Sequence, residues 1–151
     1  MSLDLPLDLL ELAHAEGIIV DTWNFAPPIE AMYLSLGGKN FIALARSLLP
    51  NKRHLRCVFA EELGHHFMTA GDLRPKRFFR YSDRLGISRE EYRARKWAAQ
   101  YLMPINELEK AIRDGICEVW ELADHFFVTE EMVHFRLHLS DITPLKYAFA
   151  K

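Results

Sequence analysis

Two glutamates and two histidines lie within one short stretch, Glu61-Glu62-Leu63-Gly64-His65-His66. Glu61 and His65 are four residues apart, and on a helix this spacing places their Cβ atoms roughly 5–6 Å apart on one face. A carboxylate and an imidazole placed in this way can bind one metal ion. The spacing therefore predicts Glu61 and His65 as metal ligands, with Glu62 as a general base acting on water that the ion activates.

The same stretch allows other arrangements. His66 follows Glu62 by four residues, so Glu62 and His66 form an alternative ligand pair, which would remove the base. Otherwise His66 packs or hydrogen-bonds beside the site. Asp72, just after this helix, is a candidate outer acceptor for His65 or a loop cap. Because a Glu-x-x-x-His pair also occurs on solvated helix faces, a site without metal stays open.

The third ligand has to come from another element. The first helix is expected over residues 50–68, and a second over residues 89–103, where Pro104 stops it. Ser88 is a good N-cap for the second helix, and Glu91 stands three residues later as its capping-box partner. This second helix is the best source of a further carboxylate.

Together the two helices resemble the ImmA/IrrE family of metallopeptidases, over roughly residues 5 to 140. The residues that carry the resemblance are Glu62-Leu63-Gly64-His65 on the first helix and Glu91, Ala94, Ala98 and Leu102-Met103-Pro104 on the second. The resemblance implies a zinc-dependent, gluzincin-like peptidase with two ligands from the first helix and one glutamate from the second. It makes Glu62 the catalytic base and His65 and Glu91 ligands, and Glu61 takes the place of the family's first histidine.

The glutamate at position 61 changes the expected chemistry. A site made of Glu61, His65 and Glu91 supplies two negative charges, so the ion is nearly neutralised and becomes a weaker Lewis acid. Oxygen-rich ligation also suits harder ions, so manganese or another divalent ion is an alternative to zinc. An active peptidase, a metal site without activity and a site without metal all stay open.

The resemblance also implies a partner. In mobile elements, including phages, proteins of this family cleave or inactivate the repressor that keeps the element silent, so a helix-turn-helix repressor is the expected protein substrate. The alternative is a non-catalytic regulator that binds a repressor or DNA through residues 121–137, which look like a helix-turn-helix. Its second helix would begin Thr129-Glu130-Glu131, and acids at the end that meets phosphates make DNA an unlikely partner.

A basic segment lies between the two site helices. Residues 74–96 contain nine Lys or Arg and three acids, with Phe78, Phe79 and Tyr81 interleaved. Such a segment can bind nucleic acid or an acidic partner. It can equally pair with the chain from Ile105 onward, which carries nine acids against five bases. We favour the second interpretation.

Composition limits the class of protein. The chain has 151 residues with a formal charge of -2, which predicts one domain over residues 1–151 and no chain-wide attraction to nucleic acid or membrane. Its two cysteines, Cys57 and Cys117, form no CxxC pair and indicate reduced thiols. The start of the chain lacks the positive charge of a signal peptide, and no apolar run approaches the roughly 20 residues of a membrane span. A cytoplasmic location without membrane contact is expected.

The remaining elements complete an α+β fold with zincin-like architecture, in which a small antiparallel sheet precedes a helical half. Gly37-Gly38-Lys39-Asn40 is typical of a hairpin turn. The other expected elements are a helix at 4–16, strands at 18–20, 31–36 and 41–45, and helices at 105–114, 117–126 and 129–139.

Overall fold

The computed structural model describes residues 4–68 and 88–142. The N-terminal part contains α1 (Leu7–Ala15), β1 (Ile18–Trp23), β2 (Ala31–Leu36), β3 (Lys39–Ala45), the short 3-10 helix η1 (Arg46–Leu48) and α2 (Lys52–Met68). The C-terminal part contains α3 (Arg89–Leu102), α4 (Ile105–Arg113), α5 (Val119–Phe126), α6 (Glu130–Leu137) and the 3-10 helix η3 (Ser140–Ile142). The α+β class predicted from the sequence is confirmed.

The three strands form one mixed sheet in the order β1-β3-β2. β2 and β3 make the predicted antiparallel hairpin, whose turn residues Gly37 and Gly38 have φ values of +57° and +77°, which favour glycine. The expectation of a purely antiparallel sheet is wrong, because β1 pairs with β3 in parallel. The chain reverses once between β1 and β2 and again in the hairpin. β3 therefore runs in the same direction as β1.

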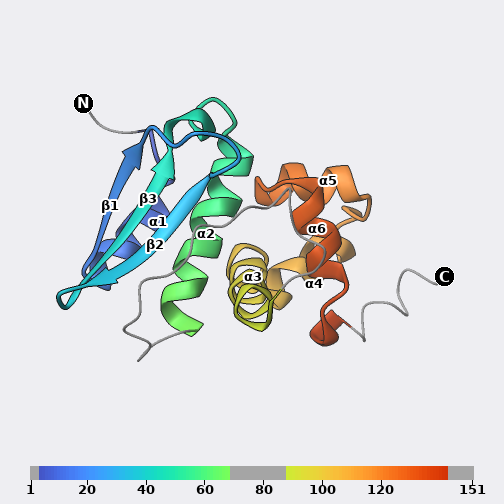
Figure 1. The fold of residues 1–151 in the computed structure, drawn as a ribbon. Helices are drawn as coiled ribbons and strands as arrows, with labels where there is room; N and C mark the ends of the chain where they lie inside the picture. Colours follow the sequence, from blue (N-terminus) through green and yellow to red (C-terminus); the bar gives the residue numbers. More distant parts are fainter. Residues whose placement is uncertain (1–3, 69–87, 143–151) are drawn as a thin grey trace.

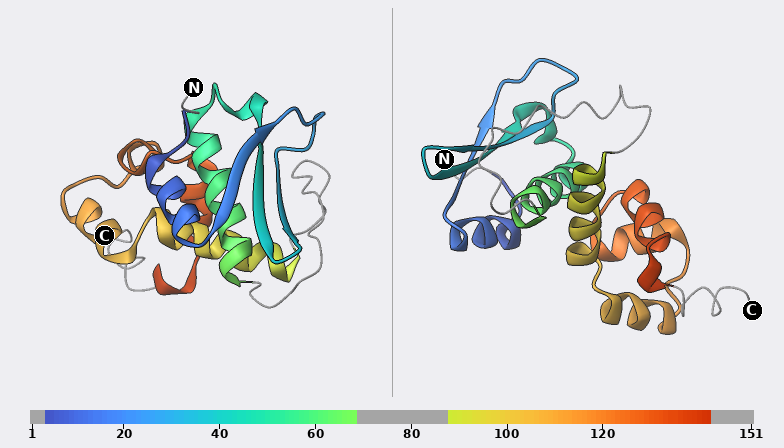
Figure 2. Two further views of the ribbon diagram at one scale, coloured as in Figure 1. Left: turned by 90° about the vertical axis from the view of Figure 1, so that its left-hand side faces the viewer. Right: turned by 60° about the horizontal axis from the view of Figure 1, so that its bottom comes forward.

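Helix α2 lies between the sheet and the helical half (Figure 1). α1 and α2 pack on one face of the sheet, and α3 packs along the other side of α2 (Figures 1 and 2). Helices α4, α5 and α6 follow on the far side of α3 in the view of Figure 1. The element that carries the candidate site is therefore the central helix of the fold.

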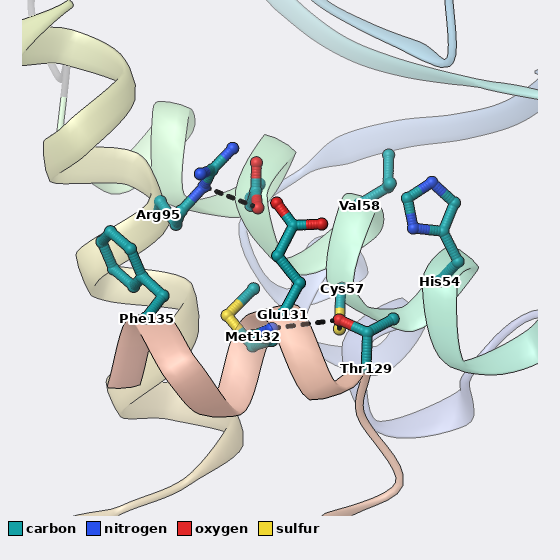
Figure 3. Close-up of a pocket in the computed structure, with 9 residues that line it drawn as sticks. His54, Cys57, Val58, Arg95, Thr129, Glu131, Met132 and Phe135 are labelled. Atoms are coloured by element: carbon teal, nitrogen blue, oxygen red, sulfur yellow. Dashed lines mark hydrogen bonds and ion pairs between the residues drawn. The ribbon is translucent and has the colours of Figure 1, made fainter. Parts of the chain in front are cut away.

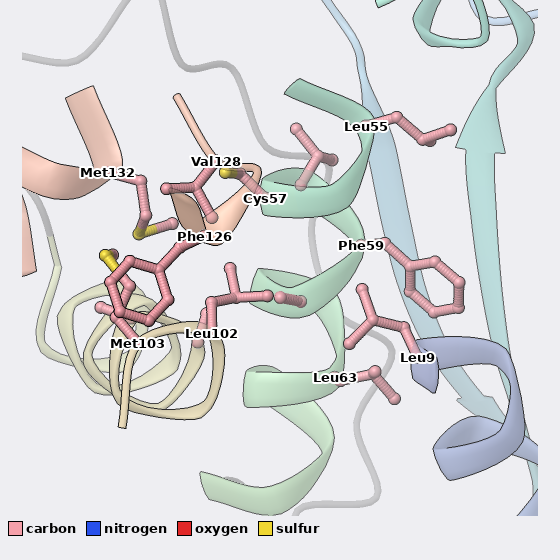
Figure 4. Close-up of a cluster of buried hydrophobic side chains, with 14 of the residues drawn as sticks. Leu9, Leu55, Cys57, Phe59, Leu63, Leu102, Met103, Phe126, Val128 and Met132 are labelled. Carbon is pink, nitrogen blue, oxygen red and sulfur yellow. The ribbon is translucent and has the colours of Figure 1, made fainter. Parts of the chain in front are cut away.

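Both sides of α2 are lined with buried apolar side chains (Figure 4). Leu55, Phe59 and Leu63 face α1 and the sheet, and each is fully buried. Burying a side chain of this size contributes roughly 1.5–3 kcal/mol. The opposite side of the cluster comprises Cys57, Leu102, Met103, Phe126, Val128 and Met132. Since both halves pack on α2, its rotation about its axis is fixed, and so is the direction of its polar side chains.

The helix boundaries follow local capping. The Ser88 hydroxyl accepts a hydrogen bond from Glu91 N at 3.2 Å and begins α3, as the sequence predicts. Thr129 begins α6 in the same way, accepting from Met132 N at 3.1 Å. The predicted N-cap Ser88 thus starts the helix that carries Glu91.

Candidate active site

The two site helices meet at backbone contact beside Gly64. A Cβ atom at this position would lie 2.9 Å from the Cα and carbonyl carbon of Ala94 on α3, and closer still to its carbonyl oxygen. Only glycine allows this approach. His65 directly follows the contact on α2, and Glu91 and Arg95 lie one turn before and one residue after it on α3. The contact therefore fixes how the polar residues of the two helices are set against each other.

Glu61 and Arg95 form an ion pair across this helix contact. Arg95 Nε donates to Glu61 Oε1 at 3.2 Å, and the side chains are 15% and 12% exposed. The Arg95 guanidinium also lies 5.6 Å from the ring centroid of Phe135 on α6, within the range of a cation–π contact. The residue predicted as the first metal ligand is therefore held by an arginine.

Two further polar residues of α2 are buried. Glu62 is 0% exposed and His65 is 2% exposed. His65 shares its helix face with Glu61, and Glu62 shares its face with His66, since each pair is four residues apart. α2 thus directs Glu61 toward α3 and His66 toward β2, as their contacts with Arg95 and Tyr33 show. A buried carboxylate next to a buried imidazole is typical of functional rather than solvated helix faces.

His66 contacts the sheet. Its Nδ1 lies 2.9 Å from the hydroxyl of Tyr33 on β2, and its Nε2 lies 3.9 Å from Glu16 Oε2. Burial raises the pKa of the Tyr33 hydroxyl above its usual value, so the phenol stays protonated at neutral pH and can donate to Nδ1. With both ring nitrogens facing these partners, His66 is better placed to orient its surroundings than to form the alternative ligand pair with Glu62.

A pocket of about 70 Å³ lies where α2, α3 and α6 meet (Figure 3). Arg95 and Glu131 reach toward this space from α3 and α6, and His54 lies on the α2 side (Figure 3). Its lining comprises His54, Cys57, Val58, Glu61, Arg95, Thr129, Glu131, Met132 and Phe135. The pocket thus places apolar walls and charged groups directly beside Glu61.

The thiol in this pocket is not activated. Burial raises the pKa of Cys57, although the nearby Thr129 hydroxyl, 3.8 Å from Sγ, favours the thiolate. A thiol with a raised pKa is a poor nucleophile at neutral pH. Cys57 is therefore a packing residue, as its sequence context indicates.

The predicted donor set fits a divalent ion in its chemistry. Glu61 and His65 offer a carboxylate and an imidazole on one face of α2, and Glu91 stands on the helix in backbone contact with it. Across residues 4–68 and 88–142, however, no three carboxylate, imidazole or thiol groups are already arranged to hold an ion. Convergence of the three ligands stays a prediction, and an ion that binds Glu61 must share or displace Arg95.

Two other sequence predictions concern residues that the structure does not describe. Asp72 lies outside the described residues, as does most of the basic segment, residues 74–96.

Two residues of the site, Arg95 and Tyr33, were not selected from the sequence. The signal for Arg95 was its position four residues after Glu91, which places both on one face of α3. Tyr33 had no local signal, since it reaches the site only through strand–helix packing.

The α5–α6 hairpin, the alternative DNA-binding element, is packed into the protein. The α6 N-cap Thr129 contacts Cys57 on α2, so the start of α6 faces the domain. Arg136 is 1% exposed, donates from Nε to the Met103 carbonyl at 2.8 Å and pairs through Nη1 with Asp141 at 2.7 Å. Thr129, the N-cap of α6, and the buried Arg136 thus both take part in internal packing.

Comparison with known proteins defines the class. Residues 23–138 match the family model of the IrrE N-terminal-like domain, Peptidase M78. The match covers most of the chain, so the chain belongs to this family, and the ImmA/IrrE resemblance is confirmed. The family indicates a metal-dependent protease with a protein substrate. No curated protein and no solved structure matches the chain.

Among the described helices, none combines the length and apolar character that a membrane crossing requires.

Proposed function

We propose that this chain is a metal-dependent endopeptidase that cleaves a regulatory protein, namely a helix-turn-helix repressor. The proposal is carried by the family membership, together with the position of Glu61, Glu62 and His65 on the central helix. That helix packs in backbone contact with the helix bearing Glu91. The arrangement supports a site built from two helices, with the base and the ligands on neighbouring turns.

In this proposal Glu61, His65 and Glu91 hold a divalent ion, zinc or manganese. The ion would supply positive charge that makes an attacking water more acidic and polarises the scissile carbonyl. Glu62 takes a proton from that water as the water oxygen forms a bond to the carbonyl carbon. It then passes the proton to the amide nitrogen as the C–N bond breaks. Burial of Glu62 favours proton exchange with the reacting water over exchange with bulk solvent.

His66 is assigned a positioning role in the same proposal. Its contacts with Tyr33 and Glu16 connect the end of α2 to β2 and to the residue that follows α1. These contacts engage both ring nitrogens of His66, which disfavours a ligand pair of Glu62 and His66. They therefore support Glu62 as the base. Asp72 remains the candidate acceptor for His65.

The experiment uses purified full-length protein and a purified helix-turn-helix repressor from the same genome, with cleavage followed by mass spectrometry. Glu62→Gln should keep the fold and metal binding and slow cleavage by about 10²–10⁴-fold, since a positioned base is lost. Glu11→Gln, an exposed glutamate in the middle of α1, is the matched control and should cleave at the wild-type rate. Equal cleavage by Glu62→Gln and wild type would refute the assignment of the base.

A non-catalytic repressor-binding protein is the second candidate, favoured by the Arg95 ion pair at the first ligand position. It predicts a stable complex with an intact repressor, and no change in binding for Glu62→Gln. Binding of DNA through α6 is not proposed, because the start of that helix packs on α2 and Arg136 is buried.

A further inference from the structure

The Glu61–Arg95 ion pair connects the two helices of the proposed site. Glu61 stands on the central helix and Arg95 on α3, where the two helices approach to backbone contact at Gly64 and Ala94. Both side chains are largely buried. Water therefore screens this pair less than it screens an ion pair on the surface.

Arg95 is also held from its other side. Its guanidinium stacks over Phe135 of α6 at 5.6 Å, and Phe135 in turn makes an edge contact with Tyr92 of α3 at 5.7 Å. An exposed arginine would sample many rotamers, whereas Arg95 is confined between the ring of Phe135 and the carboxylate of Glu61. The packing of α3 against α6 thus aims a positive charge at the first ligand position.

A guanidinium and a divalent ion compete for the same carboxylate. An ion that binds Glu61 either displaces Arg95 from the carboxylate or stays next to the positive charge of Arg95. Both effects reduce the affinity of the site for the ion. The pair also removes much of the negative charge by which a glutamate differs from a neutral histidine ligand. A positive charge within a few Å of a divalent ion also repels that ion, and the repulsion is stronger where water is largely excluded.

We propose that Arg95 controls the affinity of this site for divalent cations by competing for the Glu61 carboxylate. The inference rests on the proposed metal site at Glu61, His65 and Glu91. It adds that Glu61 and Arg95 act as one unit, so that neither residue can be exchanged alone without changing the charge of the site. The simpler alternative is that the pair only joins α2 to α3.

The test measures zinc and manganese dissociation constants by competition with a chromophoric chelator, on the full-length protein. Arg95→Gln should tighten binding of both ions on the order of tenfold, because the competing and repelling positive charge is gone. Arg95→Lys keeps that charge and should stay closer to wild type. Arg93→Gln removes an exposed charge from the same helix and is the matched control, with unchanged affinity.

A double-mutant cycle separates competition from simple helix joining. Glu61→His in the wild-type background removes the carboxylate for which Arg95 competes, so its gain in zinc affinity includes the relief of that competition. In the Arg95→Gln background there is no competition to relieve, so the same change should raise zinc affinity clearly less, which shows coupling between the two positions. Thermal melting of the metal-free variants measures the joining role independently.

Unchanged or weaker metal binding by Arg95→Gln would overturn the inference, as would equal gains from Glu61→His in both backgrounds. If wild type binds zinc and cleaves the repressor in those cases, the proposed function stands and only the role of Arg95 fails. If wild type and every variant bind no metal and leave the repressor intact, the proposed function fails as well.

Discussion

Among the individual residues, His54 interacts with three carboxylates. Glu30 forms a hydrogen-bonded ion pair with its Nε2, and Glu131 and Glu61 act on it through space. The hydrogen bond that the His54 ring donates to Glu30 is the main reason that the pKa of His54 lies above its ordinary value, and burial works in the opposite direction. His54 therefore carries a positive charge over a wider pH range than a free histidine, beside the pocket that contains Glu61.

The raised pKa predicts a pH-dependent contribution to stability. A group whose pKa is higher in the folded state stabilises the fold fully below its unfolded pKa, and this contribution is lost as the pH rises through the folded pKa. Glu30→Gln should therefore lower the His54 pKa and reduce stability more at pH 6 than at pH 9. Because both side chains are partly exposed, the loss should be about 0.5 kcal/mol.

NMR titration of His54 and denaturant unfolding at the two pH values measure these effects. Glu131→Gln is the control and should lower the pKa less, since Glu131 acts only through space. A His54 pKa at or below 6.5 in the wild type would contradict the prediction.

Among the individual residues, spacing on one helix identified Glu61, Glu62 and His65 as candidates, and the family resemblance added Glu91. Arg95 was missed because an arginine on an amphipathic helix is solvated by default. Its role depends on a carboxylate across a helix–helix contact, and single-sequence patterns do not contain that pairing. Tyr33 was missed for the same reason, since its partner His66 is 33 residues away.

At the scale of elements, the α2–α3 crossing decides the geometry of the site. Gly64→Ala would place a Cβ against backbone atoms of Ala94, which cannot move as a flexible side chain would. The helices should separate, at a cost of about 1–3 kcal/mol or more for overpacking. Zinc binding should weaken in parallel, because Glu91 moves away from His65.

Gly37→Ala is a useful comparison for that prediction. It places a Cβ in open space, and its only cost is a left-handed conformation, about 1–2 kcal/mol. It should therefore destabilise the protein without changing metal affinity. Chemical denaturation and the chelator competition assay measure both quantities. A Gly64→Ala protein with wild-type stability would show that the crossing is not as close as described.

Most elements were predictable because their signals are local. Helical periodicity predicts α3 and α6, the cap Ser88 marks the start of α3, and paired glycines predict the hairpin of β2 and β3. The parallel pairing of β1 with β3 was not predicted. It pairs Ile18 directly with Asn40, although β2 lies between β1 and β3 in the sequence, and no local pattern specifies the edge to which β1 adds.

At the scale of the whole molecule, α2 joins two parts that pack on its opposite sides. The sheet and α1 lie on one side, and α3 with the helices that follow it lies on the other (Figure 1). The proposed ligands belong to both sides of this junction, since Glu61 and His65 stand on α2 and Glu91 on α3. An ion bound by all three would therefore link α2 to the helical half.

Metal binding should accordingly raise the stability of the whole chain. A ligand that binds only the folded state at 100 times its dissociation constant adds about 2.7 kcal/mol. For a chain of this size each kcal/mol shifts the melting temperature by about 2–4 °C, so saturating zinc should raise it by about 5–11 °C. Removal of the ion with a chelator should reverse the shift. His65→Ala should abolish most of it, whereas His14→Ala, an exposed histidine on α1, should leave it unchanged. Differential scanning calorimetry with and without zinc measures the effect. An identical melting temperature in zinc and in chelator, or an undiminished shift in His65→Ala, would mean that no ion joins α2 to α3 at these residues.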